Sequence, residues 1–187
     1  MEIIFLVEEK LPKISRRASS IALSGIRRIV EYAKGLRDVI FLNVGEPDFP
    51  TPEHIREAAE KAIEEGFTHY TPIQGIPELR EAIAEKIRSE KGVDVDPNRE
   101  ILVTVGAQSA FFASCQALIN EGDEVIVQDP FYPSYEAALQ LVGAKIIRVP
   151  QKEHRNFNIS PEDIEEKITK KTKVIVLISP NNPTGSV

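Results

Sequence analysis

Residues 174–178 read Val-Ile-Val-Leu-Ile, and residues 179–185 continue with Ser-Pro-Asn-Asn-Pro-Thr-Gly. The continuous apolar run is typical of a strand that is buried on both faces of a parallel sheet. The prolines, asparagines and glycine that follow predict a loop of fixed shape at the end of this strand. Ligands bind at such strand ends, and an asparagine amide offers a donor without adding charge. On turn chemistry alone, an ordinary loop is an equally valid interpretation.

Upstream of this stretch, the sequence alternates between strand and helix patterns. Strands are expected at 101–105, 124–128, 145–149 and 173–178, and helices at 107–120, 133–142 and 161–169. Such alternation with β-branched strands predicts an α/β fold with three layers, α/β/α, around a mostly parallel sheet.

The first hundred residues are expected to be helical with fixed loops. Helical spacing begins near Ser20 and stops near Gly35, recurs through residues 55–63, and recurs again from Pro77 to just before Gly92. A short strand is expected at 39–44. Residues 1–18 have no clear place, and both a loose arm and an over-extended gene start stay open.

Composition excludes several classes of function. The 187 residues carry a formal net charge of −6, which argues against a nucleic-acid backbone or an anionic membrane as partner. A single cysteine excludes an internal disulfide, and no apolar run reaches membrane-spanning length. The short apolar stretch near the N-terminus lacks a basic leader, so we expect no secretory signal and a cytoplasmic protein.

Residues Gly106, Ala107 and Gln108 join an expected strand to an expected helix. The first backbone N–H groups of a helix point outward and its dipole favours negative charge, so this junction is a candidate anion site. The alternative is a plain strand-to-helix turn. Neither a Walker A pattern nor GxGxxG is present, which argues against a nucleotide.

Two further loops carry aromatic residues. Residues 129–133 read Asp-Pro-Phe-Tyr-Pro, and the aromatic pair is either a core plug or a ring that stacks on a flat ligand. Tyr70 lies in a second loop, where the alternative is a packed aromatic with a wet hydroxyl. The three histidines, His54, His69 and His154, share no metal-binding spacing, so no metal site is predicted.

Residues 182–185, Asn-Pro-Thr-Gly, match the NPTG signature of the pyridoxal-phosphate (PLP) dependent aminotransferases of class I/II, fold type I. Three other segments resemble the same family in the same order: Gly-Glu-Pro-Asp-Phe-Pro-Thr-Pro at 45–52, the Y-x-x-x-x-G-x-x-x-L-R pattern that starts at Tyr70, and the 129–133 loop. The resemblance runs from about residue 15 to the end and is closest to aspartate and aromatic aminotransferases. It implies transfer of an amino group from an amino acid to a 2-oxo acid by means of pyridoxal 5′-phosphate.

The resemblance also implies roles for individual residues. The backbone amides of Ala107 and Gln108 hold the cofactor phosphate, the ring of Tyr132 stacks on the pyridine ring, and the Asn182 side chain donates to the phenolic oxygen. Tyr70 reaches the cofactor phosphate of the other subunit in a homodimer. Gly45 lies at the substrate carboxylate, where a side chain would collide.

By the same resemblance, residues 1–50 are an N-terminal arm and small-domain segment, and residues 51–187 are an incomplete PLP-binding large domain. The family's cofactor-binding lysine, its acidic partner of the pyridine nitrogen and its substrate-clamping arginine all lie downstream of NPTG. Only Ser186 and Val187 follow here, so no catalytic residue is assigned and the chain is expected to be truncated and inactive alone. A non-catalytic module that binds PLP or an anion, and a structural remnant without a ligand, stay open as alternatives. The amino donor is not identified.

The resemblance leads to two structural expectations. The peptide bonds Asp129–Pro130 and Asn182–Pro183 are expected to be cis, since family members commonly use cis prolines in these loops. The chain is also expected to self-associate through exposed apolar surface and open strand edges.

Overall fold

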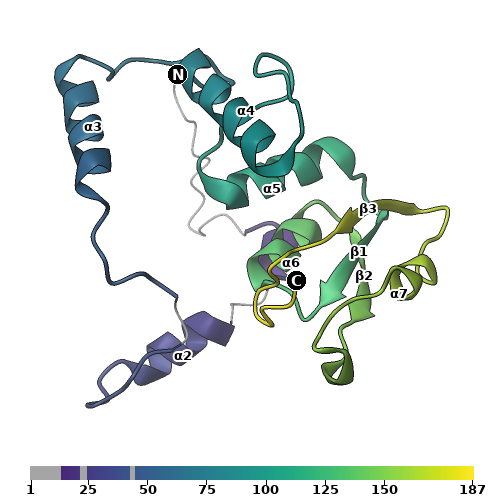
Figure 1. Cartoon of the computed structure of the whole chain (residues 1–187). Coiled ribbons are helices and arrows are strands. Elements are labelled where there is room, and N and C mark those ends of the chain that lie inside the picture. Colours follow the sequence, from purple (N-terminus) through teal and green to yellow (C-terminus); the bar gives the residue numbers. More distant parts are fainter. Residues whose placement is uncertain (1–13, 22–24, 43–44) are drawn as a thin grey trace, which may run out of the picture. The chain divides into compact units, whose positions relative to one another are not determined.

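The computed structural model describes residues 14–21, 25–42 and 45–187. Figure 1 shows the elements of the whole chain, which divides into two compact units. The first unit combines the described part of Met1–Arg28 with Phe111–Val187, and the second is Ile29–Ala110.

A three-stranded parallel sheet forms the centre of the first unit. Strand β1 (Glu124–Asp129) lies between β2 (Lys145–Pro150) and β3 (Thr172–Val176). Ile126 pairs with Ile147 on one side and with Ile175 on the other, in parallel register. The prediction of an α/β fold with a parallel sheet is therefore confirmed for these three strands.

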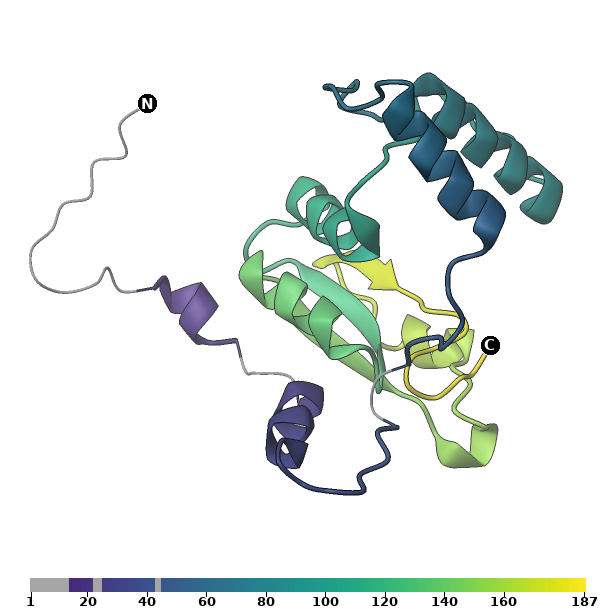
Figure 2. The same ribbon diagram turned by 90° about the vertical axis from the view of Figure 1, so that its left-hand side faces the viewer.

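Helices cover this sheet from both sides because of how the strands are connected. Helix α6 (Pro133–Leu141) joins β1 to β2, whereas η1 (Glu153–Arg155) and α7 (Pro161–Glu165) join β2 back to β3 on the other side of β1. Both crossovers are right-handed by rule, and they run in opposite directions across the sheet, so they leave on opposite faces. Figures 1 and 2 show α6 and α7 on the two sides of the sheet.

The apolar core lies between β1, α6 and the C-terminal part of α5 (Gly106–Leu118). Its buried members are Cys115, Ile119, Val125, Val127, Phe131, Leu139 and Val142. Pro133 occupies the first turn of α6, where its missing N–H costs no helical hydrogen bond. Burial of Cys115 raises the pKa of its thiol, so the thiol is kept in its uncharged form.

The strand at the C-terminal end is an edge strand, which corrects the expectation that residues 173–178 are buried on both faces. Val174 and Val176 pack on the core, but Ile175 is 41% and Leu177 61% exposed. The strand buried on both faces is β1, because among the described residues only β1 has a neighbour on each side. Strand β3 ends at Val176, two residues earlier than expected.

Residues 101–105 form no strand, and the described part of the expected strand at 39–44 (residues 39–42) forms none either, so these two predictions are wrong. A strand is stabilised by a ladder of hydrogen bonds with another strand. The N–H of Val103 instead donates to the carbonyl of Gln74, 3.0 Å away in a loop. Residues 43 and 44 lie outside the described residues, as do residues 1–13.

The predicted helices are present with shifted ends. The helices that precede α5 are α1 (Arg16–Ser19), α2 (Gly25–Ala33), α3 (Glu53–Glu64) and α4 (Pro77–Lys91). Helix α4 ends at Lys91, just before Gly92 as predicted, and the φ of 67° at Gly92 is the left-handed conformation of a helix C-cap. Helix α7 stops at Glu165, four residues before its expected end.

A buried carboxylate ties the sheet together at the start of β1. Glu124 is 5% exposed and accepts hydrogen bonds from the Thr169 hydroxyl at 2.6 Å and from the Lys145 ammonium at 2.9 Å. The Thr169 hydrogen bond first, and then that of Lys145, hold the pKa of Glu124 below its ordinary value. The ionised carboxylate therefore links β1 to β2 and to the turn that precedes β3.

This shift predicts a specific acid sensitivity. A carboxyl group whose pKa is lower in the folded state stabilises that state above the ordinary carboxyl pKa, and the contribution is lost as pH falls through the lowered pKa. We expect the free energy of unfolding of wild type to fall more steeply than that of Glu124→Gln between about pH 6 and about pH 3. Urea unfolding followed by circular dichroism measures both, with Glu64→Gln on exposed α3 as the control. Parallel pH curves for wild type and Glu124→Gln would contradict the assignment.

Candidate functional site

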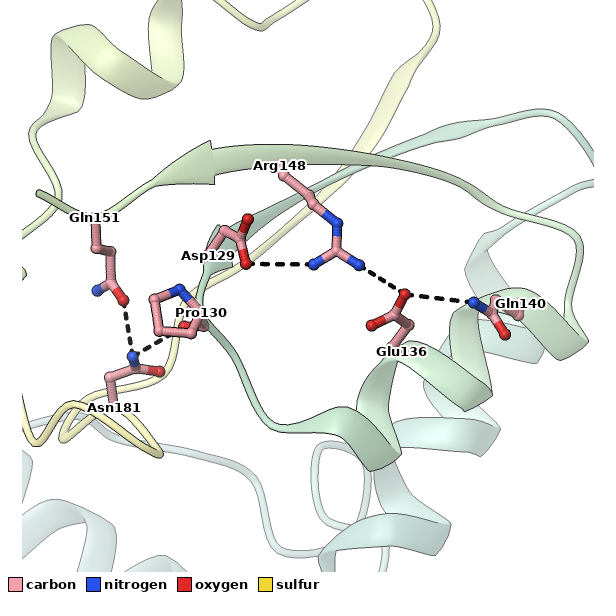
Figure 3. Close-up of polar contacts among 7 residues, drawn as sticks. All are labelled: Asp129, Pro130, Glu136, Gln140, Arg148, Gln151 and Asn181. Atoms are coloured by element: carbon pink, nitrogen blue, oxygen red, sulfur yellow. Dashed lines mark hydrogen bonds and ion pairs between the residues drawn. The ribbon is translucent and has the colours of Figure 1, made fainter. Parts of the chain in front are cut away.

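The carboxyl ends of β1, β2 and β3 lie at one edge of the first unit, because the three strands are parallel. Polar side chains gather in the segments that leave this edge. Asp129 ends β1, Gln151 follows β2, and Asn181 lies in the loop after β3 (Figure 3).

The loop after β1 separates its two aromatic residues. Phe131 is 7% exposed and belongs to the apolar core, whereas Tyr132 is only half-buried at the N-terminus of α6. The Tyr132 ring meets Tyr135 edge-on, with centroids 5.5 Å apart and an angle of 77°. The core-plug interpretation therefore applies to Phe131, and the ring that is open to a ligand is that of Tyr132.

Arg148 of β2 fixes this loop against α6. Its guanidinium donates to Glu136 at 2.6 Å and to Asp129 at 3.4 Å, and Glu136 also accepts from Gln140 (Figure 3). The same guanidinium lies 5.6 Å from the centre of the Phe131 ring, within range of a cation–π interaction. One side chain thus holds the end of β1, the buried aromatic and the first turn of α6.

The chain after β3 is attached to β1 by a side chain. The regular pairing of β1 with β3 ends at Val127 and Val176. Beyond it, the side-chain carbonyl of Gln128 accepts from the N–H of Ile178 at 2.7 Å. Because Gln128 is 6% exposed, this bond extends the connection between the two strands inside the protein.

The two adjacent asparagines of this loop face different environments. The loop closes on itself, since Gly185 N–H donates to the Asn181 carbonyl at 2.7 Å and Asn181 N–H donates to the Ser186 carbonyl at 2.8 Å. Asn181 is 3% exposed and Asn182 is exposed. The buried asparagine holds the turn and the exposed one is open to a ligand.

Three peptide bonds in these loops are cis. Asp129–Pro130 and Asn182–Pro183 are cis as predicted, and Ser179–Pro180 is a third that the sequence analysis missed.

In the second unit, Ala107 and Gln108 lie exposed in the first turn of α5. First-turn amides of a helix have no acceptor within the helix, and no acidic residue lies in this turn. Gly106 has a φ of 75°, and a Cβ added there would meet nothing within 4 Å. The backbone at this helix start is therefore open to an anion.

The pattern that begins at Tyr70 has a structural and an exposed part. Gly75 has a φ of 99°, and a Cβ there would lie 2.6 Å from Val103 Cγ2, so only glycine fits. Arg80, 6% exposed, donates to the carbonyls of Gly75 and Pro97. Tyr70 itself is fully exposed, so its ring is not packed against other side chains as the alternative interpretation required. Gly45 is also exposed, in a segment without regular structure.

The described part of the chain shows neither of two further patterns, a metal site and a membrane-spanning helix. Over residues 14–21, 25–42 and 45–187, no group of histidine, cysteine, aspartate and glutamate side chains is arranged to hold a metal ion. His54 lies exposed on α3. Within the same ranges, no helix has the length and apolar character needed to cross a membrane.

A family model described as aminotransferase class I and II matches residues 37–187. The chain belongs to this family. This aminotransferase chain is 44% identical over 174 residues to the aspartate aminotransferase of Pyrococcus abyssi, covering 93% of this chain and 45% of that relative. It is 40% identical to aromatic-amino-acid aminotransferase 2 of Thermococcus litoralis, again covering 93% of this chain and 45% of the relative.

Solved structures agree with the aminotransferase fold. A single mutant of the Thermus thermophilus aspartate aminotransferase superposes with a TM-score of 0.90 at 43% identity, covering 95% of this chain and 47% of that one. The chain thus spans about 45% of the length of its relatives, in their N-terminal part. The family depends on PLP.

The side chains that shape the loops were not predicted from the sequence. Gln128, Arg148, Gln151 and Asn181 all make contacts at this edge of the sheet. Gln128 and Gln151 lie within one residue of the ends of β1 and β2, and Asn181 lies beside Asn182. This position in the sequence was the only signal that could have indicated them. No spacing rule indicates which polar side chain at a strand end is buried.

The bond from Ile178 to Gln128 gives a test of how this edge is held. In Gln128→Met, a side chain of similar size leaves the Ile178 N–H without its acceptor, which costs about 1–3 kcal/mol of unfolding free energy. Gln140→Met is the control, since Gln140 is half-buried and makes a longer bond of 3.4 Å. Denaturant unfolding and amide exchange around Ile178 measure the effect. An equal loss of unfolding free energy in both variants would show that the Gln128 bond contributes no more than the longer Gln140 bond.

Proposed function

We propose that this chain is the cofactor-facing part of a PLP-dependent aminotransferase that transfers an amino group from an amino acid to a 2-oxo acid. One observation carries the proposal: the half-open ring of Tyr132 and the exposed amide of Asn182 belong to loops at the same edge of one parallel sheet. A flat ring that bears a phenolic oxygen needs such a stacking surface and such a donor. The residues present therefore fit the cofactor.

The individual roles are proposed from the resemblance to the family. Asn182 donates its side-chain amide to the phenolic oxygen, and Tyr132 stacks on the pyridine ring. The first-turn amides at Ala107 and Gln108 bind the phosphate, with the favourable end of the helix dipole. When bound, PLP supplies the electron sink for transfer of the amino group.

Two further residues are proposed to face the substrate and a second subunit. Gly45 leaves room for the substrate carboxylate, and fully exposed Tyr70 reaches the cofactor phosphate of the partner in a homo-oligomer. Residues 1–50 are assigned to the small domain and arm, and residues 51–187 to part of a three-layer large domain. The cytoplasmic location stays a prediction.

Residues 1–187 alone are proposed to bind PLP weakly and to catalyse no transamination. None of their lysines, for example Lys145 or Lys173, matches the family's cofactor lysine. Lys145 is instead paired with Glu124. The residues that would bind the pyridine nitrogen and clamp the substrate carboxylate are likewise unassigned.

Binding can be measured with pyridoxamine 5′-phosphate, which keeps the ring, phenolic oxygen and phosphate but has no aldehyde to react with surface lysines. We expect Asn182→Ala and Tyr132→Ala each to weaken binding about fivefold, because one neutral contact contributes about 1 kcal/mol. Tyr132→Phe keeps the ring and should bind like wild type. Equilibrium dialysis gives the dissociation constants, and equal affinities in all four proteins would contradict the assigned site.

A coupled assay with aspartate or an aromatic amino acid and 2-oxoglutarate tests the activity, with free PLP as the reference. We expect no rate above that of free PLP. A clear excess that disappears in Asn182→Ala would mean that residues 1–187 carry a catalytic lysine of their own.

The exposed apolar side chains predict self-association. Ile175 and Leu177 are exposed on and just after the edge strand β3, and open strand edges and apolar surface favour association. We expect sedimentation velocity to show a concentration-dependent increase in mass that is reduced in Leu177→Lys. Leu102→Lys, at another exposed leucine, is the control. A monomer at all concentrations would contradict the prediction.

A further inference from the structure

The buried side chain of Asn181 joins three separate segments of the first unit. Its amide nitrogen lies 3.1 Å from the Pro130 carbonyl, 2.8 Å from the Gln151 side-chain oxygen and 2.9 Å from the Thr184 hydroxyl. These acceptors belong to the loop after β1, the residue after β2 and the loop after β3. Figure 3 shows the first two of these contacts meeting at one nitrogen atom.

We propose that Asn181 is a positioning residue, which holds the loops that carry Tyr132 and Asn182 at a fixed spacing so that both contact one flat ligand. Asn181 itself is 3% exposed and cannot offer its side chain to that ligand. Pro130 lies two residues before Tyr132, and Asn181 lies directly before Asn182. This inference rests on the proposed PLP site.

The chemistry of the contacts selects a donor at this position. The Pro130 carbonyl can only accept a hydrogen bond, so the nitrogen of the Asn181 amide, not its oxygen, must face it. That oxygen is buried and has no hydrogen-bond partner among the described residues. A buried oxygen without a partner destabilises the folded state, so this arrangement is kept only if the hydrogen bonds from the Asn181 N–H groups contribute more.

Asn181→Asp is the matched substitution because it keeps the shape and replaces the donor with an acceptor. An oxygen then faces the Pro130 carbonyl, which has no hydrogen to donate, so the bond between the two loops is lost and they separate. Asn156→Asp, at an exposed turn residue, introduces the same change without this burial and serves as the control.

A double-mutant cycle separates positioning from general stability. Dialysis with pyridoxamine 5′-phosphate compares wild type, Asn181→Asp, Asn182→Ala and the double variant, after circular dichroism has confirmed the fold. We expect Asn181→Asp to weaken binding about tenfold in wild type, which corresponds to about 1.4 kcal/mol. In the Asn182→Ala background the same change should weaken binding by less than threefold, since the donor being positioned is already absent. Effects that multiply in full would overturn the proposal.

Hydrogen exchange tests the connection without any ligand. Asn181→Asp should speed amide exchange at least tenfold in both 128–132 and 179–186 and leave 145–149 unchanged, whereas Asn156→Asp should change neither loop. Unchanged exchange in both loops would overturn the proposal. If Asn181→Asp does not fold, Gln151→Met carries the same cycle, because it removes one acceptor and keeps the Asn181 amide.

The outcomes distinguish this inference from the proposed function. If wild type binds the ligand and Asn181→Asp binds equally well, the positioning role is wrong and the PLP site stands. If wild type does not bind, the proposed function fails. The exchange experiment then still decides whether Asn181 holds the two loops together.

Discussion

The burial of β1 between two parallel neighbours is the constraint on which the first unit depends. Val125, Ile126 and Val127 are each at most 1% exposed, so every backbone group of this strand must find its partner in β2 or β3. The three strands lie in parallel register, with Ile126 opposite Ile147 and Ile175. This parallel arrangement brings their carboxyl ends to one edge, where the loops that leave them must share space.

The sequence predicted those structural features that are determined by a residue's own backbone or its near neighbours, and not those that depend on distant segments. Pro133 and Gly92 predicted a helix start and a helix end because each acts through its own backbone. The apolar run at 174–178 predicted a strand correctly but gave the wrong burial, since the same residues suit a central strand and an edge strand with one open face. Residues 101–105 have strand composition, yet Val103 bonds to a loop instead of a second strand. Residue composition alone does not show whether a second strand lies alongside to pair with such a segment.

The candidate site shows the same limit for side chains. Family motifs pointed to Tyr132 and Asn182, and the structure leaves both at least partly open at one edge of the sheet. The same reasoning overlooked Asn181, although it is the next residue in the stretch. Neighbouring asparagines have identical chemistry, and only the turn that Gly185 and Ser186 close decides which of them points inward. Orientation of that kind follows from tertiary contacts and not from residue type.

Different interactions secure the two ends of the sheet. At the start of β1, ionised Glu124 is held by Lys145 and Thr169, a charged contact that fixes one geometry. At the opposite end, neutral amides of Gln128, Gln151 and Asn181 connect the loops. Ion pairs lie at this end too, since Arg148 bridges Asp129 at the end of β1 and Glu136 in α6. At this edge the work is therefore divided, because the amides connect the loop after β1 with the loop after β3, whereas the ion pairs of Arg148 hold the first turn of α6 against the end of β1.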